Sequence, residues 1–212
     1  MNSLKKHRNT LKNHYSNRFS EFGATVKGVD WGDENKAVER YKNMLAIERF
    51  DPEGYGRTKT LLDVGCGYGE LYSYVTSTGV RLQYHGIDIV QEMVDYASQK
   101  NPEIDFQCVD IFDYSPRIQF DYVVCNGILT QKLDLSILDM DKFAEKLLDK
   151  MFGLCSRGIA FNVMSTKVNF MVDNLYYKSP VELLAFCLNS LSEKVVMNHV
   201  CPRYEYTMYV YK

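Results

Sequence analysis

The chain has 212 residues and a formal net charge of −2, from 25 basic and 27 acidic side chains. Because 46% of the residues are hydrophobic and 25% are charged, the composition excludes disordered and fibrous proteins and is typical of a globular fold. A chain of this length is expected to form one domain around a single core.

The positive charge gathers in the first 20 residues. Five basic side chains precede the first acidic residue, Glu21: Lys5, Lys6, Arg8, Lys12 and Arg18. The acidic remainder argues against extended contact with a nucleic-acid backbone. The N-terminal segment lacks the apolar stretch of a secretory signal, and the longest apolar run, residues 158–164, is too short to cross a bilayer. We therefore expect a cytoplasmic protein without nucleic-acid or membrane partners.

Six cysteines are scattered along the chain without a CxxC pair, and several lie in apolar runs. They are Cys66, Cys108, Cys125, Cys155, Cys187 and Cys201. This pattern indicates reduced, mostly buried thiols rather than a disulfide framework or a zinc site.

The first 59 residues contain two helical patterns and two loops. Apolar spacing predicts helices at about residues 4–19 and 33–50. A turn-rich loop, residues 23–32, separates them and contains Trp31. A second loop, residues 51–59, contains one proline and two glycines and is expected to precede the main core.

From residue 60 the predicted strands and helices alternate, which is typical of a parallel sheet covered by helices on both faces. The expected strands are residues 60–64, 83–88, 105–109, 120–125 and 158–164, and the expected helices are residues 70–77, 91–100 and 139–155.

The last third of the chain differs in pattern. A predicted helix at residues 180–192 is followed by two β-rich runs, residues 194–199 and 204–211. A connection this short suits an antiparallel pair, because a parallel return needs a crossover of about a dozen residues.

The segment LLDVGCGYGE combines an apolar strand, Asp63, a glycine loop and a helix that begins near Glu70. Glycines permit positive φ angles and close approach of a ligand, and the helix N-terminus favours an anion. Dinucleotide sites prefer GxGxxG, whereas here the third glycine, Gly69, comes one residue early. Asp63 would repel a pyrophosphate and attract an ammonium group. The spacing therefore favours S-adenosylmethionine over a dinucleotide.

Two more acidic residues end predicted strands. Asp88 follows Gly69 by 19 residues and is placed to accept hydrogen bonds from both ribose hydroxyls. Asp110 ends the next unit, where it could meet the exocyclic amine of adenine. A single aspartate at a strand end is more often a turn residue or helix cap. Three in register with a glycine loop indicate a nucleoside site.

With these motifs the chain resembles the class I S-adenosylmethionine-dependent methyltransferases from Thr60 onward. DVGCGYG matches the first motif, QEM and VDIF match the adenine-contacting segments, and FDYVVCNGIL matches the fourth motif, beside the methionine moiety. The cofactor residues that the resemblance implies are Trp31, Asp63, Gly65, Cys66, Gly67, Gly69, Asp88, Ile89, Met93, Asp110, Ile111, Asn126 and Gly127. The implied fold is α/β and Rossmann-like, a doubly wound seven-stranded sheet ordered 3-2-1-4-5-7-6 with strand 7 antiparallel.

Three shorter segments are similar to the small stand-alone bacterial members of this class: GVDW at residues 28–31, LYY at residues 175–177 and the ending YEYTMYVYK. The similarity implies one methyltransferase domain, residues 1–212. Residues 1–59 would form a helical lid with Trp31 and Tyr15 near the cofactor, residues 60–212 the cofactor-binding core, and residues 165–212 the acceptor-site elements. An indole in this position more often packs a lid onto its core.

The resemblance also bears on the acceptor. CNGI, residues 125–128, replaces the D/N-P-P-aromatic motif that holds a base amine or planar amide, and no acid-rich magnesium set is present. We expect metal-free methyl transfer to an oxygen or nitrogen atom of a small polar molecule or saccharide. His199 is the candidate general base, although a structural histidine is the commoner role. Tyr177, Tyr204 and Glu205 are candidate acceptor contacts.

Two other functions stay open at this point. A nicotinamide-dependent oxidoreductase would use the same strand, turn and helix, and a non-catalytic protein could bind S-adenosylmethionine without turning it over. The sequence does not indicate an oligomeric state.

Overall fold

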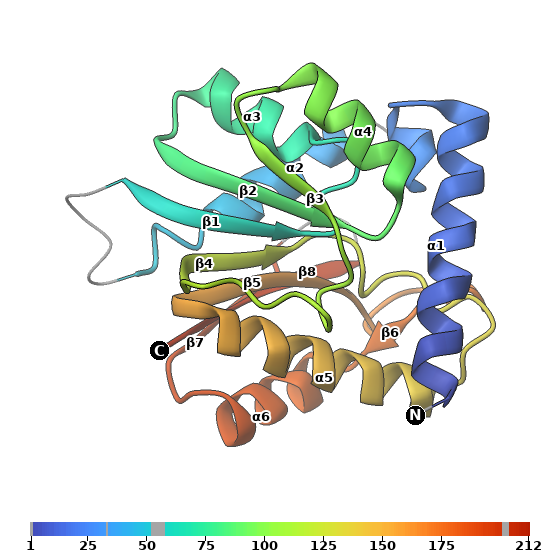
Figure 1. Ribbon diagram of the computed structural model, residues 1–212. Helices are drawn as coiled ribbons and strands as arrows, with labels where there is room; N and C mark the ends of the chain where they lie inside the picture. Colours follow the sequence, from blue (N-terminus) through green and yellow to red (C-terminus); the bar gives the residue numbers. More distant parts are fainter. Residues whose placement is uncertain (1, 33, 52–57, 201–203) are drawn as a thin grey trace.

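The computed structural model describes residues 2–32, 34–51, 58–200 and 204–212. Its centre is one sheet, which Figure 1 shows nearly edge-on with helices above and below it. The strands are β1 Lys59–Val64, β2 Leu82–Asp88, β3 Asp105–Cys108, β4 Phe120–Cys125, β5 Cys155–Ser165, β6 Tyr177–Lys178, β7 Val195–Asn198 and β8 Glu205–Tyr211.

The strand order is β3-β2-β1-β4-β5-β8-β7, and β6 pairs with the end of β5. Neighbours from β3 to β5 are parallel, whereas β8 is antiparallel to both β5 and β7. The predicted order and the antiparallel strand are confirmed. The two-residue β6 was not predicted, because it is too short to show an alternating pattern.

Among the described residues, the helices and helical turns around the sheet are α1 Asn2–Phe22, η1 Val26–Val29, α2 Glu34–Leu45, α3 Glu70–Thr78, α4 Gln91–Lys100, α5 Ile137–Leu154 and α6 Pro180–Ser190. Helix α5 begins two residues before the predicted start, because the Ser136 hydroxyl accepts a hydrogen bond from the Asp139 amide and caps the helix. Helix α2 ends at Leu45 rather than near residue 50, and a series of turns follows it.

Each face of the sheet carries its own apolar core. On one face, buried side chains of β1, β4 and β5 pack against α5 and α6, which contribute residues such as Phe143 and Leu183. On the other face, α2, α3 and α4 pack against the sheet through residues such as Met44, Leu71 and Val94. Alternate residues of β8 face the two cores, since Met208 belongs to the first and Tyr209 to the second.

Helices α1 and α2 differ in how they are held. Ala37, Tyr41 and Met44 bury α2 in the second core, and Tyr209 donates a hydrogen bond to the Asn43 carbonyl at its end, 2.7 Å away. By contrast α1 stands across the carboxyl ends of the strands (Figure 1). Of the α1 side chains that the structure describes, two are buried, His7 and Leu11. Helix α2 is therefore part of the core, and α1 is a cover placed over one edge of the sheet.

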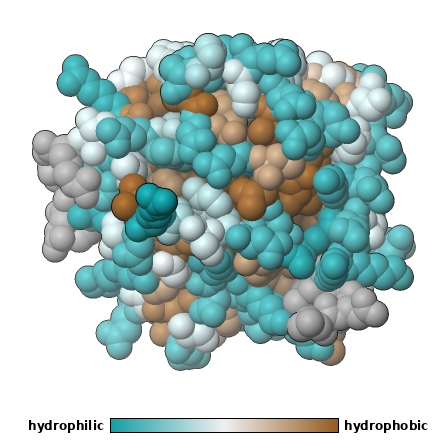
Figure 2. All heavy atoms as spheres, in the orientation of Figure 1, coloured by the Kyte–Doolittle hydropathy of each residue, from teal (hydrophilic) through white to brown (hydrophobic). Residues whose placement is uncertain are grey.

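The surface of this view is mostly hydrophilic, with apolar side chains showing in patches between polar ones (Figure 2). No helix among the described residues is both long and apolar enough to span a membrane. The five cysteines in the described part of the chain are free thiols, and Cys66, Cys125, Cys155 and Cys187 are buried. Cys201 lies outside the described residues.

Candidate functional site

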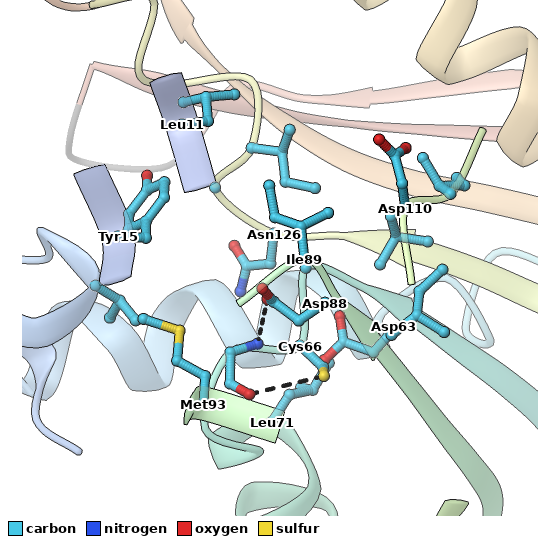
Figure 3. Close-up of a pocket in the computed structure, with 18 of the residues that line it drawn as sticks. Leu11, Tyr15, Asp63, Cys66, Leu71, Asp88, Ile89, Met93, Asp110 and Asn126 are labelled. Carbon is cyan, nitrogen blue, oxygen red and sulfur yellow. Dashed lines mark hydrogen bonds between the residues drawn. The ribbon is translucent and has the colours of Figure 1, made fainter. Parts of the chain in front are cut away.

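A cavity opens at the carboxyl ends of β1, β2, β3 and β4 and is partly covered by α1. Its empty volume, including the open solvent at its mouth, is about 1100 Å³, and its lining comes mainly from the loops after these strands and from α1. The carboxyl edge of an open α/β sheet is where such folds bind ligands. Figure 3 shows Asp63, Asp88 and Asp110 around one side of the space, with Tyr15 and Leu11 of α1 on the other.

The glycine loop after β1 is fastened to β2. The amides of Gly65 and Cys66 both donate to the Ile87 carbonyl, at 2.8 and 3.1 Å. Gly65 has φ 75°, and a Cβ there would lie 2.8 Å from the Ile128 side chain, so no other residue fits without displacement. Gly65, Cys66 and Gly67, three of the residues predicted to bind the cofactor, line the cavity.

Gly69 does not line the cavity. It caps α3 with φ 82°, and a Cβ there would lie 3.2 Å from both Ala97 and Phe106. This glycine therefore permits α3 to approach α4 and β3 closely. The structure assigns it to packing beneath the site rather than to the cavity wall.

Asp63 lies at the carboxyl end of β1, and the residue is 2% exposed. Its Oδ2 accepts a hydrogen bond from Tyr84, while its buried Oδ1 has no partner in the described part of the chain. Burial raises the pKa of Asp63 to about 7, against the opposing effect of the Tyr84 bond. A buried carboxylate oxygen without a partner at a cavity wall is ready to accept a ligand hydrogen bond.

Asp88 lies at the end of β2 and supports the glycine loop. Its Oδ2 accepts from the Gly67 amide and its Oδ1 from the Val90 amide, both at 2.9 Å (the first is dashed in Figure 3). Burial raises the pKa of Asp88, and these amide hydrogen bonds oppose the rise. Each carboxylate oxygen keeps a second lone pair that can face the cavity.

The third predicted acid, Asp110, pairs with a residue that the sequence did not indicate. Its Oδ2 lies 2.5 Å from Nη1 of Arg8 on α1, and its Oδ1 accepts from the Phe112 amide at 3.0 Å. Arg8, Leu11 and Tyr15 all line the cavity. Their spacing of three and then four residues places them on one helical face. Leu11 and Tyr15 were detectable in the sequence as apolar positions within a basic helix, whereas Arg8 was not.

The far end of the cavity is formed by the loop after β4. Asn126 and Gly127 line it, and Gly127 has φ 102°. A Cβ on Gly127 would lie 3.3 Å from Nε1 of Trp31, so the indole packs directly against this glycine. Both side-chain polar atoms of Asn126 are buried and lack partners in the described part of the chain. Ile89, Met93 and Ile111 also line the cavity.

The predicted catalytic and acceptor residues do not line the cavity. The exposed ring of His199 packs on Tyr206, with centroids 5.5 Å apart. Tyr177 accepts a hydrogen bond from the Val172 amide at 3.2 Å, and Tyr204 is 48% exposed. Glu205 is buried in an ion pair with Arg40. Strand β7 ends and β8 begins on the side of the sheet where the parallel strands end, which is the side that holds the cavity. The proposed roles of these four residues stay predictions.

Comparison with known proteins agrees with this geometry. Residues 61–149 match a family model described as a methyltransferase domain. A protein of Mycobacterium tuberculosis whose name describes a methyltransferase is 32% identical over 155 residues, which cover 71% of this chain and 91% of that protein.

Two solved structures share the fold at low identity. A magnesium protoporphyrin IX methyltransferase from Synechocystis with bound S-adenosylmethionine has a TM-score of 0.67 and 14% identity, covering 97% of each chain. An N-methyltransferase from Bradyrhizobium japonicum, in complex with S-adenosylhomocysteine, has a TM-score of 0.62 and 14% identity, covering 95% of this chain and 97% of that one.

Proposed function

Since the chain belongs to the class I S-adenosylmethionine-dependent methyltransferases, we propose that it transfers the methyl group to an oxygen or nitrogen atom of a small polar molecule or saccharide. The observation that carries the proposal is that one cavity brings together the groups expected to bind the cofactor. The glycine loop and the carboxylates of Asp63, Asp88 and Asp110 all border it, and α1 covers it.

The residues present fit the cofactor. The unpartnered Oδ1 of Asp63 is suited to the ammonium of a methionine moiety, and Gly65 and Gly67, which have positive φ angles and no side chains, bring the loop backbone to the cavity wall. Asp88 would accept from the ribose hydroxyls, with Met93 and Ile111 beside the adenine and Asp110 at its edge. The same carboxylate at Asp63 disfavours a nicotinamide dinucleotide, whose pyrophosphate would meet it.

When bound, the cofactor supplies an electrophilic methyl group on a sulfonium. The work left to the protein is alignment of the acceptor and exclusion of water, which together are worth roughly 7 to 11 kcal/mol. Leu11 and Tyr15 line the cavity from α1, so this helix covers part of it. Burial raises the pKa of the Tyr15 hydroxyl, so at neutral pH it donates a hydrogen bond rather than removing a proton.

The cavity lining around Gly127 would suit a small acceptor. Trp31 packs on Gly127, and Tyr15 and Asn126 bring polar groups to the same lining. An acceptor hydroxyl also needs a base at neutral pH. His199, at the same edge of the sheet, remains the candidate only for an acceptor that extends beyond the mouth of the cavity.

A product screen tests the proposal. The purified protein is incubated with S-adenosylmethionine and a library of small polar metabolites and saccharides, and S-adenosylhomocysteine release is measured together with acceptor mass. We expect release that depends on one acceptor class and is reduced in Asp88→Ala. Acceptor methylation restricted to protein or nucleic acid would overturn the small-molecule assignment.

A further inference from the structure

A chain of polar contacts runs behind the end wall of the cavity, and Glu205 is at its centre. This residue begins β8 and is 5% exposed. Arg40 of α2 donates from Nε to both carboxylate oxygens, at 3.1 and 3.0 Å, and from Nη2 to Oε1. On the other side, Nδ2 of Asn162 on β5 donates to Oε2 at 2.8 Å. One carboxylate therefore joins α2 to the middle of the sheet.

Both ends of this series of polar contacts reach the cavity wall. The Oδ1 of Asn162 accepts the amide hydrogen of Gly127, 2.8 Å away. The guanidinium carbon of Arg40 lies 4.8 Å from the centroid of the Trp31 ring, and Trp31 packs on Gly127. Arg40 thus supports the indole directly and supports the glycine through Glu205 and Asn162.

The contact with Asn162 also orients the neighbouring peptide group. In a trans peptide the N–H and C=O point in opposite directions, so binding the Gly127 amide sets the direction of the Asn126 carbonyl. The Gly127 carbonyl is held separately by the Thr130 hydroxyl at 2.6 Å. Both peptide groups around Gly127 are therefore held in place at the end of the cavity.

A buried charge pair is an expensive way to gain stability alone, because apolar residues of similar size often stabilise a fold equally well. Here the cost is visible, since Nη1 of Arg40 is buried without a partner in the described part of the chain. The pair instead fixes the orientation of the Arg40 guanidinium, because its planar set of N–H donors matches a carboxylate in one geometry.

We propose that Arg40 and Glu205 are positioning residues that hold Trp31 and the Asn126–Gly127 peptide in the arrangement that the donor and acceptor require. This inference rests on the proposed function. Neither residue lines the cavity, so both act through Trp31 and Gly127. This proposal replaces the expectation that Glu205 contacts the acceptor.

The chain offers a spectroscopic reporter and a matched control. Trp31 is its single tryptophan, so intrinsic tryptophan fluorescence reports on this wall. The ion pair of Arg157 with Asp51 has the same exposures, 18% for arginine and 6% for the carboxylate, as the pair of Arg40 with Glu205. It lies at the opposite end of β5, near the start of the strand, and does not line the cavity. Asp51→Asn therefore removes an equivalent buried charge without touching the network.

The experiment compares Glu205→Gln, Arg40→Gln and Asp51→Asn with the wild type by Trp31 emission and by calorimetric titration of S-adenosylhomocysteine. We expect Glu205→Gln and Arg40→Gln to shift the ligand-free emission to longer wavelength and weaken binding about tenfold. The double variant that combines Glu205→Gln with Arg40→Gln should bind S-adenosylhomocysteine no more weakly than either single variant, because the two residues act as one unit. Asp51→Asn should lower thermal stability while keeping wild-type emission and affinity.

The proposal is overturned if Glu205→Gln keeps the emission and affinity of Asp51→Asn, or if the effects of the two single variants add in the double variant. Arg40→Lys keeps the charge but not the fork, and its emission should lie between those of the wild type and Arg40→Gln. A wild-type protein that does not bind S-adenosylhomocysteine would contradict the proposed function. The ligand-free emission comparison would still decide whether the pair positions Trp31.

Discussion

The hydroxyl of Tyr84 donates a hydrogen bond to Oδ2 of Asp63 over 2.5 Å, and both residues are buried. They come from neighbouring parallel strands, β2 and β1. This one bond does not compensate for burial of the charge, so the pKa of Asp63 rises to about 7. The carboxylate that we assign to the cofactor's ammonium is therefore costly to the folded protein in its ionised form.

Asp63→Asn should stabilise the protein above neutral pH. The folded-state pKa is raised, so wild-type stability is highest below the unfolded pKa and falls as pH rises through about 7. Asparagine does not ionise and can still accept the Tyr84 bond. We expect the variant's free energy of unfolding to exceed that of the wild type by about 2 to 4 kcal/mol at pH 8, relative to their difference at pH 4. Urea denaturation at both pH values measures this, and an unchanged difference would contradict the buried-charge account.

The same substitution should weaken ligand binding. Only ionised Asp63 attracts an ammonium group, so wild-type affinity for S-adenosylhomocysteine should rise about tenfold from pH 6 to pH 8, following the ionised fraction. Asp63→Asn should bind weakly at both values. Calorimetry at the two pH values checks this, and a flat wild-type profile would remove Asp63 from the binding site.

Asp88→Ala should weaken S-adenosylhomocysteine binding by about 1 to 3 kcal/mol, because the ribose loses a charged acceptor and the Gly67 amide loses its support. Asp105→Ala is the control, since Asp105 begins the neighbouring strand β3 and its carboxylate is half exposed. Equal affinities of the two variants would contradict the ribose assignment.

Arg8→Gln should loosen α1 over the cavity. Arg8 pairs with Asp110 and packs over Phe112, and α1 buries few other side chains. We expect S-adenosylhomocysteine to dissociate several-fold faster, because a cover that is less firmly held opens more often. Stopped-flow displacement measures the rate.

Hydrogen exchange tests the division between α1 and α2. Ligand should slow exchange in residues 5–22 and change it little in residues 34–45, since α2 belongs to the core. Equal protection of residues 5–22 with and without ligand would make α1 a permanent part of the fold.

For an acceptor that fits within the cavity, His199→Ala should retain kcat within about threefold. Its ring is exposed and packs on Tyr206 outside the cavity, whereas a general base must reach the acceptor proton. A loss of about 100-fold or more, with unchanged cofactor affinity, would restore His199 as the base.

The sequence predicted the longer strands from their apolar or alternating runs, as in Phe120–Cys125. The order of the strands was implied by the resemblance to the methyltransferase family, because no local pattern determines which strands are neighbours. The limits of β4 and α4 agree with the prediction to the residue. The role of Glu205 was missed, because its partner Arg40 lies 165 positions away and no local pattern joins them. The pairing of Arg8 with Asp110, across 102 positions, was missed for the same reason.

Gly69 shows a second limit of sequence interpretation. The glycine motif predicted one role for three glycines, but packing against Ala97 and Phe106 gives the third a different one. A motif marks where backbone freedom is needed and does not say whether a ligand or a neighbouring side chain needs it.

Calorimetric titration of S-adenosylhomocysteine into the purified wild-type protein, with NAD titrated in parallel, tests the central claim most directly. We predict one saturable site for S-adenosylhomocysteine, weakened by about 1 to 3 kcal/mol in Asp88→Ala, and no binding heat for NAD. Saturable binding of NAD, with no heat from S-adenosylhomocysteine, would contradict the assignment of this cavity to S-adenosylmethionine.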